Sequence, residues 1–167
     1  ANGIFLAEYQ LATGDKTYFS ELKKCCDLLA QRVTEKGIMG HHYSIPYSGG
    51  GLIIINVQAH LAWALAEKCG YPINEKSWCD SFSEVKKSVD PKTGALGYSS
   101  RARWSPDIAA RTGAMVTALI VAGREVEFAQ SLAGALVRLN GRMRHAHAMS
   151  SIGLIYGFSG IKMAAST

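Results

Sequence analysis

Four of the five histidines fall in two glycine-containing segments, and their spacing suggests chemistry. His41 and His42 are adjacent in KGIMGHHYSIPYSGGG, and His145 and His147 form a His-x-His pair in NGRMRHAH. Imidazole can bind a metal or carry a proton near neutral pH. No Asp, Glu or Cys lies close in sequence to complete a coordination shell, so we predict no metal and no cofactor. These histidines are expected to form a polar binding or catalytic rim, or to stabilise their loops.

Tyrosines and arginines occur in the same kind of segment. Tyr43 and Tyr47 follow the first histidine pair, while Tyr98, Arg101 and Arg103 lie in or after a second glycine segment, GALGYSS. Tyrosine rings at these positions could stack on a sugar or an apolar ligand, or pack beneath the loops.

The charge is unevenly distributed along the chain. Residues 1–90 contain 9 Lys and Arg against 10 Asp and Glu, a balance of −1, whereas residues 91–167 contain 9 against 3, a balance of +6. A basic half is consistent with an anionic small molecule or glycan as ligand, or with a solvated or partner-facing surface. No known nucleic-acid motif accompanies the charge, so no nucleic-acid partner is predicted.

One apolar stretch carries a polar stripe. Asn56, His60 and Glu67 are spaced by 4 and 7 residues, which places them on one face of a helix. Buried polar groups need partners. Asn56 and His60 are therefore candidate binding residues facing a central funnel, with a satisfied core histidine as the alternative.

The elements that position these residues are all predicted to be helices, because apolar residues recur at helical spacing and no strand pattern is found. Asp15 and Asn74 are predicted N-caps, and Ser105, Pro106 and Asp107 form a typical helix start. The predicted helices span Asn2–Ala12, Thr17–Thr34, Leu52–Lys68, Glu75–Val89, 106–122, Glu125–Leu139 and about Ala146–Met163.

Composition indicates one all-α domain over residues 1–167, since hydrophobic residues make up 48% and charged residues 19%. The longest apolar run is too short and too polar for a membrane span. The four cysteines form no C-x-x-C motif, which argues against a zinc ribbon.

Apolar and amphipathic helices alternate, which predicts helical hairpins with apolar helices inside and amphipathic helices outside. Short turns at Gly14, Gly70 and Gly123 alternate with longer connectors. GIMGHHY recurs as GALGYSS 57 residues later and, in degenerate form, as NGRMRHAH. We therefore expect Gly37, Gly40, Gly94 and Gly97 to serve the fold, and the three connectors to share one end of the array.

This pattern resembles the α/α toroid of terpenoid cyclases and protein prenyltransferase subunits. YQLATGDKTYFSELKK, GIMGHHY and the stretch from ARTGAMV to MSSIGL resemble more closely an uncharacterised bacterial α/α-toroid family. The resemblance implies attachment to PDZ domains in some members and a cell-envelope or secreted location. The chain lacks the Asp-x-Asp-Asp motif of squalene-type cyclases and a recognisable prenyltransferase zinc set.

Three functions remain open from the sequence. The first is a binding or scaffolding module with a polar, basic funnel mouth. The second is a polysaccharide lyase-like enzyme acting on an acidic glycan, which needs no pair of loop carboxylates. The third is a terpenoid or prenyl-diphosphate enzyme. Because the resemblance implies about six helix pairs in a closed toroid, we expect flanking sequence or a second copy to complete it.

Overall fold

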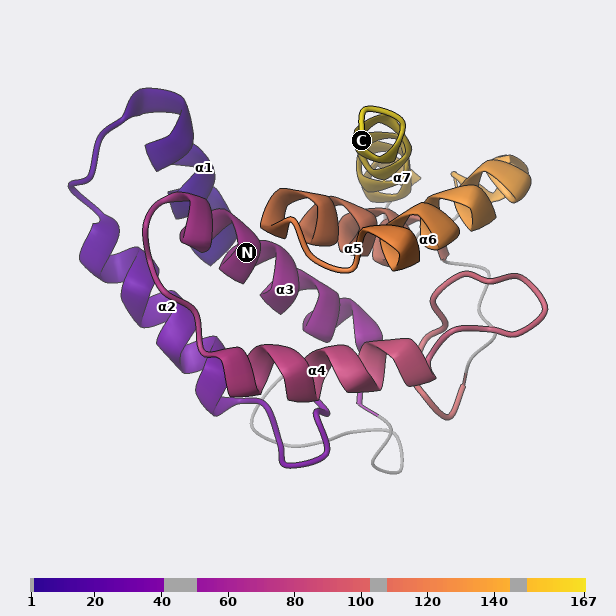
Figure 1. The fold of residues 1–167 in the computed structure, drawn as a ribbon, viewed down its shortest axis with the longest axis horizontal. Coiled ribbons are helices and arrows are strands. Elements are labelled where there is room, and N and C mark those ends of the chain that lie inside the picture. The colour runs from indigo at the N-terminus through magenta and orange to yellow at the C-terminus, as the bar shows by residue number, and fades with distance from the viewer. Residues whose placement is uncertain (1, 41–50, 103–107, 145–149) are drawn as a thin grey trace.

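The computed structural model describes residues 2–40, 51–102, 108–144 and 150–167. Within these ranges the chain forms the seven predicted α-helices and no named strand; Val89 and Leu96 form an isolated bridge. The all-α prediction is confirmed. The helices are α1 (Asn2–Thr13), α2 (Phe19–Gln31), α3 (Ile53–Lys68), α4 (Glu75–Lys87), α5 (Ile108–Ala122), α6 (Val126–Arg138) and α7 (Ser150–Ala164), with a 3₁₀ turn at Asn140–Arg142 (Figure 1).

The helices pack in the alternating order that the sequence predicts. The apolar helices contact one another in succession, α1 with α3, α3 with α5 and α5 with α7. The amphipathic helices each contact the two apolar helices that precede and follow them, except that α4 packs mainly on α3. In Figure 1 the short turns after α1, α3 and α5 lie toward the left of their hairpins, and the longer connectors lie toward the bottom and right.

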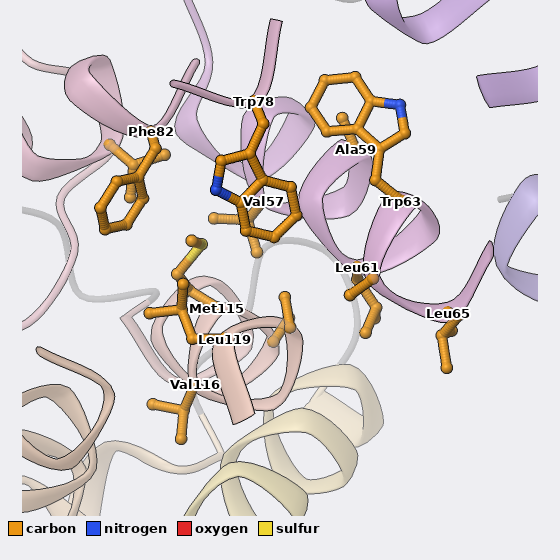
Figure 2. Packing of buried hydrophobic residues seen from close by; sticks show 14 of the residues in the cluster. Val57, Ala59, Leu61, Trp63, Leu65, Trp78, Phe82, Met115, Val116 and Leu119 are labelled. Carbon is orange, nitrogen blue, oxygen red and sulfur yellow. The ribbon is translucent and has the colours of Figure 1, made fainter. Parts of the chain in front are cut away.

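The core is centred on α3 and α5, and α1, α2, α4 and α6 also contribute buried side chains to it. Eleven residues of α3 and eleven of α5 are buried, as expected for helices that are apolar on nearly every side. The rings of Trp78 and Phe82 reach from α4 toward Val57 on α3 and Met115 on α5 (Figure 2). Burial of these large side chains is the main contribution that we identify to the stability of the array.

The short turns and helix starts follow from local chemistry. Gly14, Gly70 and Gly123 all have positive φ, which lets the chain leave each apolar helix sharply. The Asn74 cap is confirmed, since its Oδ1 accepts a hydrogen bond from the Ser77 amide at 2.9 Å. The Asp15 cap is wrong. Asp15 accepts from the Thr17 amide instead, which closes a turn ahead of a helix that begins only at Phe19.

The glycine connectors repeat in three dimensions. The Gly37 amide donates to the Thr34 carbonyl and the Gly94 amide to the Asp90 carbonyl, both at 2.8 Å, and both glycines have a φ of 75°. Gly40 and Gly97 do not have positive φ. Each copy also buries the apolar side chain at the same position, which is Met39, Leu96 or, in the degenerate third copy, Met143.

No helix within the described ranges is long and apolar enough to cross a membrane.

Candidate functional site

Eleven residues are predicted to form the funnel mouth, and the structure describes four of them. Asn56, His60, Tyr98 and Arg101 lie within the described ranges. The other seven lie outside them, so their binding role stays a prediction: His41, His42, Tyr43, Tyr47, Arg103, His145 and His147.

The first two connectors meet at the start of α3. The Leu52 amide donates to the Met39 carbonyl of the first connector (residues 32–52) at 2.9 Å. The next amide, that of Ile53, donates to the Tyr98 carbonyl of the second connector (residues 88–107) at 3.1 Å. Amides in the first turn of a helix have no partner within the helix. Each connector therefore supplies one carbonyl to this helix start, and the two segments are held at the same end of the array.

The Tyr98 turn (residues 98–102) is closed by its own backbone. The amides of Tyr98 and Ser99 both donate to the Ala102 carbonyl, at 3.0 and 3.2 Å. The Ala102 amide in return donates to Ser99 Oγ at 2.9 Å. Arg101 lies at the tip of this turn and is exposed. The turn therefore presents a cationic side chain to solvent from a fixed backbone.

Hydrogen bonds to side chains of α4 and α5 also hold the turn. Ser100 Oγ donates a short hydrogen bond to the carboxylate of Glu84 on α4, a group that is only 4% exposed. The Leu96 amide, two residues before the turn, donates to Thr112 Oγ1 on α5 at 3.1 Å. The turn is thus held by α3, α4 and α5 together.

A buried arginine lies beneath Tyr98. Arg111, on the first turns of α5, is 3% exposed, and its guanidinium lies 5.9 Å from the centre of the Tyr98 ring. An arginine over an aromatic face gains cation–π stabilisation, more so when it is desolvated. The sequence alone does not single out Arg111 as a candidate site residue. A lone arginine in an otherwise apolar, buried helix was the signal that could have identified it.

The first connector also carries an arginine at this end. Arg32, at the end of α2, donates from its guanidinium to the Gly40 carbonyl at 2.5 Å. Gly40 directly precedes the residues that lie outside the described part of the chain. Three guanidinium groups, those of Arg32, Arg101 and Arg111, therefore belong to the segments that meet around the start of α3.

The polar stripe of α3 lies against α4. Asn56 Nδ2 donates to the Gly37 carbonyl at 2.7 Å and to Ser81 Oγ at 2.9 Å. His60 is fully buried, with ring centroids 4.3 Å from Trp78 and 6.0 Å from Phe82, both on α4. Burial, with a smaller contribution from Arg124, lowers the pKa of His60 to about 3. The structure thus places both residues in a packed helix contact, and their binding role stays a prediction.

Glu67, the last member of the stripe, lies at the opposite end of α3. Arg124, in the turn between α5 and α6, donates to Glu67 at 2.9 Å and to Glu75 at 2.7 Å, and it lies 4.7 Å from the Trp78 ring centre. The hydrogen bond from Arg124 lowers the pKa of Glu75. This network joins the α3–α4 and α5–α6 hairpins at the short-turn end, and its charges are paired with one another.

The connector end combines an exposed arginine, Arg101, with a buried arginine, Arg111, whose guanidinium lies over the Tyr98 ring. The hydroxyl groups of Ser99 and Ser100 hold the turn through internal hydrogen bonds. The described residues contain no group of three His, Cys, Asp or Glu side chains able to hold a metal ion. All four cysteines are free, and burial raises the pKa of Cys26 to about 12, so that thiol is a weak nucleophile at neutral pH.

Comparison with known proteins places the chain in one family. No curated protein gives a significant match to the chain. No solved structure does so either. Residues 1–164 match the family model described as Domain of unknown function (DUF6288). Because the match spans nearly the whole sequence, the chain belongs to the DUF6288 family.

Proposed function

We propose that this domain is a binding module of the α/α-toroid type and that its ligand is an anionic glycan bound at the connector end. The observation that carries the proposal is the convergence of two connectors on consecutive amides at the start of α3, those of Leu52 and Ile53. That convergence puts Tyr98 and Arg101 on a fixed turn at the end of the array where the basic half of the chain contributes its loops.

The chemistry of the turn favours an acidic sugar. A uronate carries a carboxylate that an arginine can bind with two parallel hydrogen bonds, and a sugar ring has an apolar face that can pack against tyrosine. Arg101 is exposed on this turn, and the hydroxyls of Ser99 and Ser100 hold the turn through internal hydrogen bonds. Arg111 keeps the Tyr98 ring in place from below. The same proposal includes two features that the family resemblance implies, which are the toroid fold and attachment to a PDZ domain.

Calorimetric titration with oligogalacturonate tests this proposal. Wild-type protein is expected to bind the acidic oligosaccharide, and to bind a neutral maltooligosaccharide of the same length at least tenfold more weakly. Arg101→Gln is expected to weaken oligogalacturonate binding by about tenfold, or about 1.4 kcal/mol, because one charge-assisted contact is lost. Binding should also weaken as salt is raised.

Lys16→Gln is the matched control, since Lys16 is an exposed cation in the short turn at the opposite end. It should bind like wild type. No binding at millimolar oligosaccharide, or equal affinities for Arg101→Gln and wild type, would contradict the proposal. Release of unsaturated product from the polymer during the same titration would instead favour the lyase-like alternative.

A further inference from the structure

The two terminal helices carry outward-facing apolar stripes. On α1 the stripe consists of Phe5, Glu8 and Leu11, and Phe5 is 68% exposed. On α7 it consists of Ile155, Phe158 and Lys162, and the two apolar side chains are 61% and 59% exposed. Exposed large apolar groups in a row mark a surface that packs against something.

Helix packing in the rest of the array explains why these stripes are exposed. Among the apolar helices, α3 lies between α1 and α5, and α5 lies between α3 and α7. Within the described chain, α1 and α7 each have one apolar helix beside them. Each also turns small residues inward, with Gly3 and Ala7 buried on α1 and Gly157 and Gly160 buried on α7. The outward stripes therefore occupy the position where the next apolar helix would lie.

The charges on the two stripes are opposite. Glu8 is the only charged residue of α1, and Lys162 is the only charged residue of α7. Both are exposed, and neither forms an ion pair within the described residues. The net charge of the surrounding sequence differs in the same direction. It is −1 for residues 1–90, which contain Glu8, and +6 for residues 91–167, which contain Lys162. Contact between unlike edges is thus favoured and contact between like edges is opposed.

Hollows flank both edges. One of about 300 Å³ lies beside α1 and α2, lined by Asn2, Gly3, Cys25, Leu28, Leu29 and Arg32. Another of about 510 Å³ lies beside α7, lined by Asn140, Gly141, Met143, Arg144, Leu154 and Phe158. The hollow beside α7 includes Phe158 of the stripe, so a side chain of an opposing helix can enter it. The hollow beside α1 lies where α1 meets α2.

We propose that a second copy of this chain docks head to tail, with the Phe5–Glu8–Leu11 stripe of α1 in one copy packed on the Ile155–Phe158–Lys162 stripe of α7 in the other. The contact extends the row of apolar helices across the interface and pairs Glu8 with Lys162 of the second copy. Because it joins two different surfaces, it closes into a ring or continues as a chain of copies.

Sedimentation equilibrium of the chain over a range of concentrations tests the proposal. The mass is expected to rise above the 18.0 kDa of one copy as concentration increases. Glu8→Lys and Lys162→Glu, each alone, place like charges together and should raise the dissociation constant at least tenfold. The double variant reverses both charges and should associate like wild type, and a mixture of the two single variants should also associate.

Apolar variants provide the second arm. Phe158→Asp should abolish association, whereas Val137→Asp is the matched control, because Val137 is similarly exposed at 53% but lies on the outer helix α6. Circular dichroism shows whether each variant is folded. A folded wild-type chain that stays at 18.0 kDa at every concentration would overturn the proposal. So would association that the charge variants leave unchanged.

Discussion

His60 is a fully buried imidazole in an aromatic surrounding, and neither ring nitrogen has a hydrogen-bond partner in the described chain. Protonating it would place a charge in a low-dielectric site near the Arg124 guanidinium, which is why the pKa falls to about 3. His60 packs against aromatic side chains, and its protonation would destabilise the folded core.

The stability of the protein is therefore expected to fall in acid. The folded-state pKa of His60 is below the ordinary value of 6.5, so below pH 6.5 the unfolded state binds a proton that the folded state excludes. At pH 4.5 this lowers the free energy of unfolding by about 3 kcal/mol relative to pH 7.5, because each pH unit below the ordinary pKa adds about 1.36 kcal/mol. Urea unfolding at the two pH values measures the difference.

His60→Phe is the control for that experiment, because phenylalanine retains an aromatic ring and does not titrate. The pH-dependent loss should shrink by most of its size in this variant. An identical loss in wild type and His60→Phe would show that other groups cause the acid sensitivity.

Gly37 and Gly14 separate two roles of glycine. Both have a φ near 75°, but a Cβ on Gly37 would lie 1.9 Å from the Asp80 carbonyl oxygen, whereas a Cβ on Gly14 would meet nothing within 4 Å. Gly14→Ala should cost about 1 kcal/mol from backbone strain alone. Gly37→Ala should cost clearly more, because α4 must also move. Equal losses in chemical denaturation would contradict the close packing of the first connector on α4.

At the scale of elements, α7 is held on α5 by a very close backbone contact. A Cβ on Gly113 would lie 2.1 Å from the Tyr156 carbonyl oxygen, and one on Gly160 would lie 2.7 Å from the Gly113 carbonyl oxygen. Small residues let helices approach closely, which increases dispersion contacts along the line where they cross.

Gly113→Ala is expected to lower the melting temperature by displacing α7. The matched control is Gly134→Ala on α6, where the nearest atom outside the helix backbone is a flexible Arg138 nitrogen at 3.5 Å. That change should stabilise the protein by about 0.5–1 kcal/mol, because alanine favours a helix more than glycine. Two alanine variants with shifts of the same sign would argue against the α5–α7 contact described above.

Sequence patterns predicted the helices and the order in which they pack, but not the contacts of individual side chains. Periodicity identified every helix, and Gly14, Gly70 and Gly123 marked the short turns, because both signals are local. The prediction that Asp15 is an N-cap failed because an aspartate side chain accepts a backbone amide in the same way whether it closes a turn or caps a helix. Helical periodicity identified the stripe of Asn56 and His60, but it says nothing about which element the stripe contacts. In the structure both residues contact α4, and their binding role stays a prediction.

At the scale of the whole molecule, alternation of helix types predicted the inner and outer order of packing, and recurrence of the glycine segments predicted that connectors share an end. The hydrogen bonds from Leu52 and Ile53 confirm this for the described parts of the first two connectors. The role of Arg111 could not be read from the chain, because its contact with Tyr98 joins residues 13 apart through a turn whose shape depends on α3 and α4.

Binding of an anionic glycan where the two connectors meet can be tested by amide chemical-shift mapping of labelled protein during titration with oligogalacturonate. The largest shifts are expected in the Tyr98 turn, residues 98–102, and at the start of α3, residues 52–56. These shifts should be lost in Arg101→Gln and retained in Lys16→Gln. Shifts concentrated around Arg124 and the short turns, or no shifts at millimolar oligosaccharide, would contradict the claim.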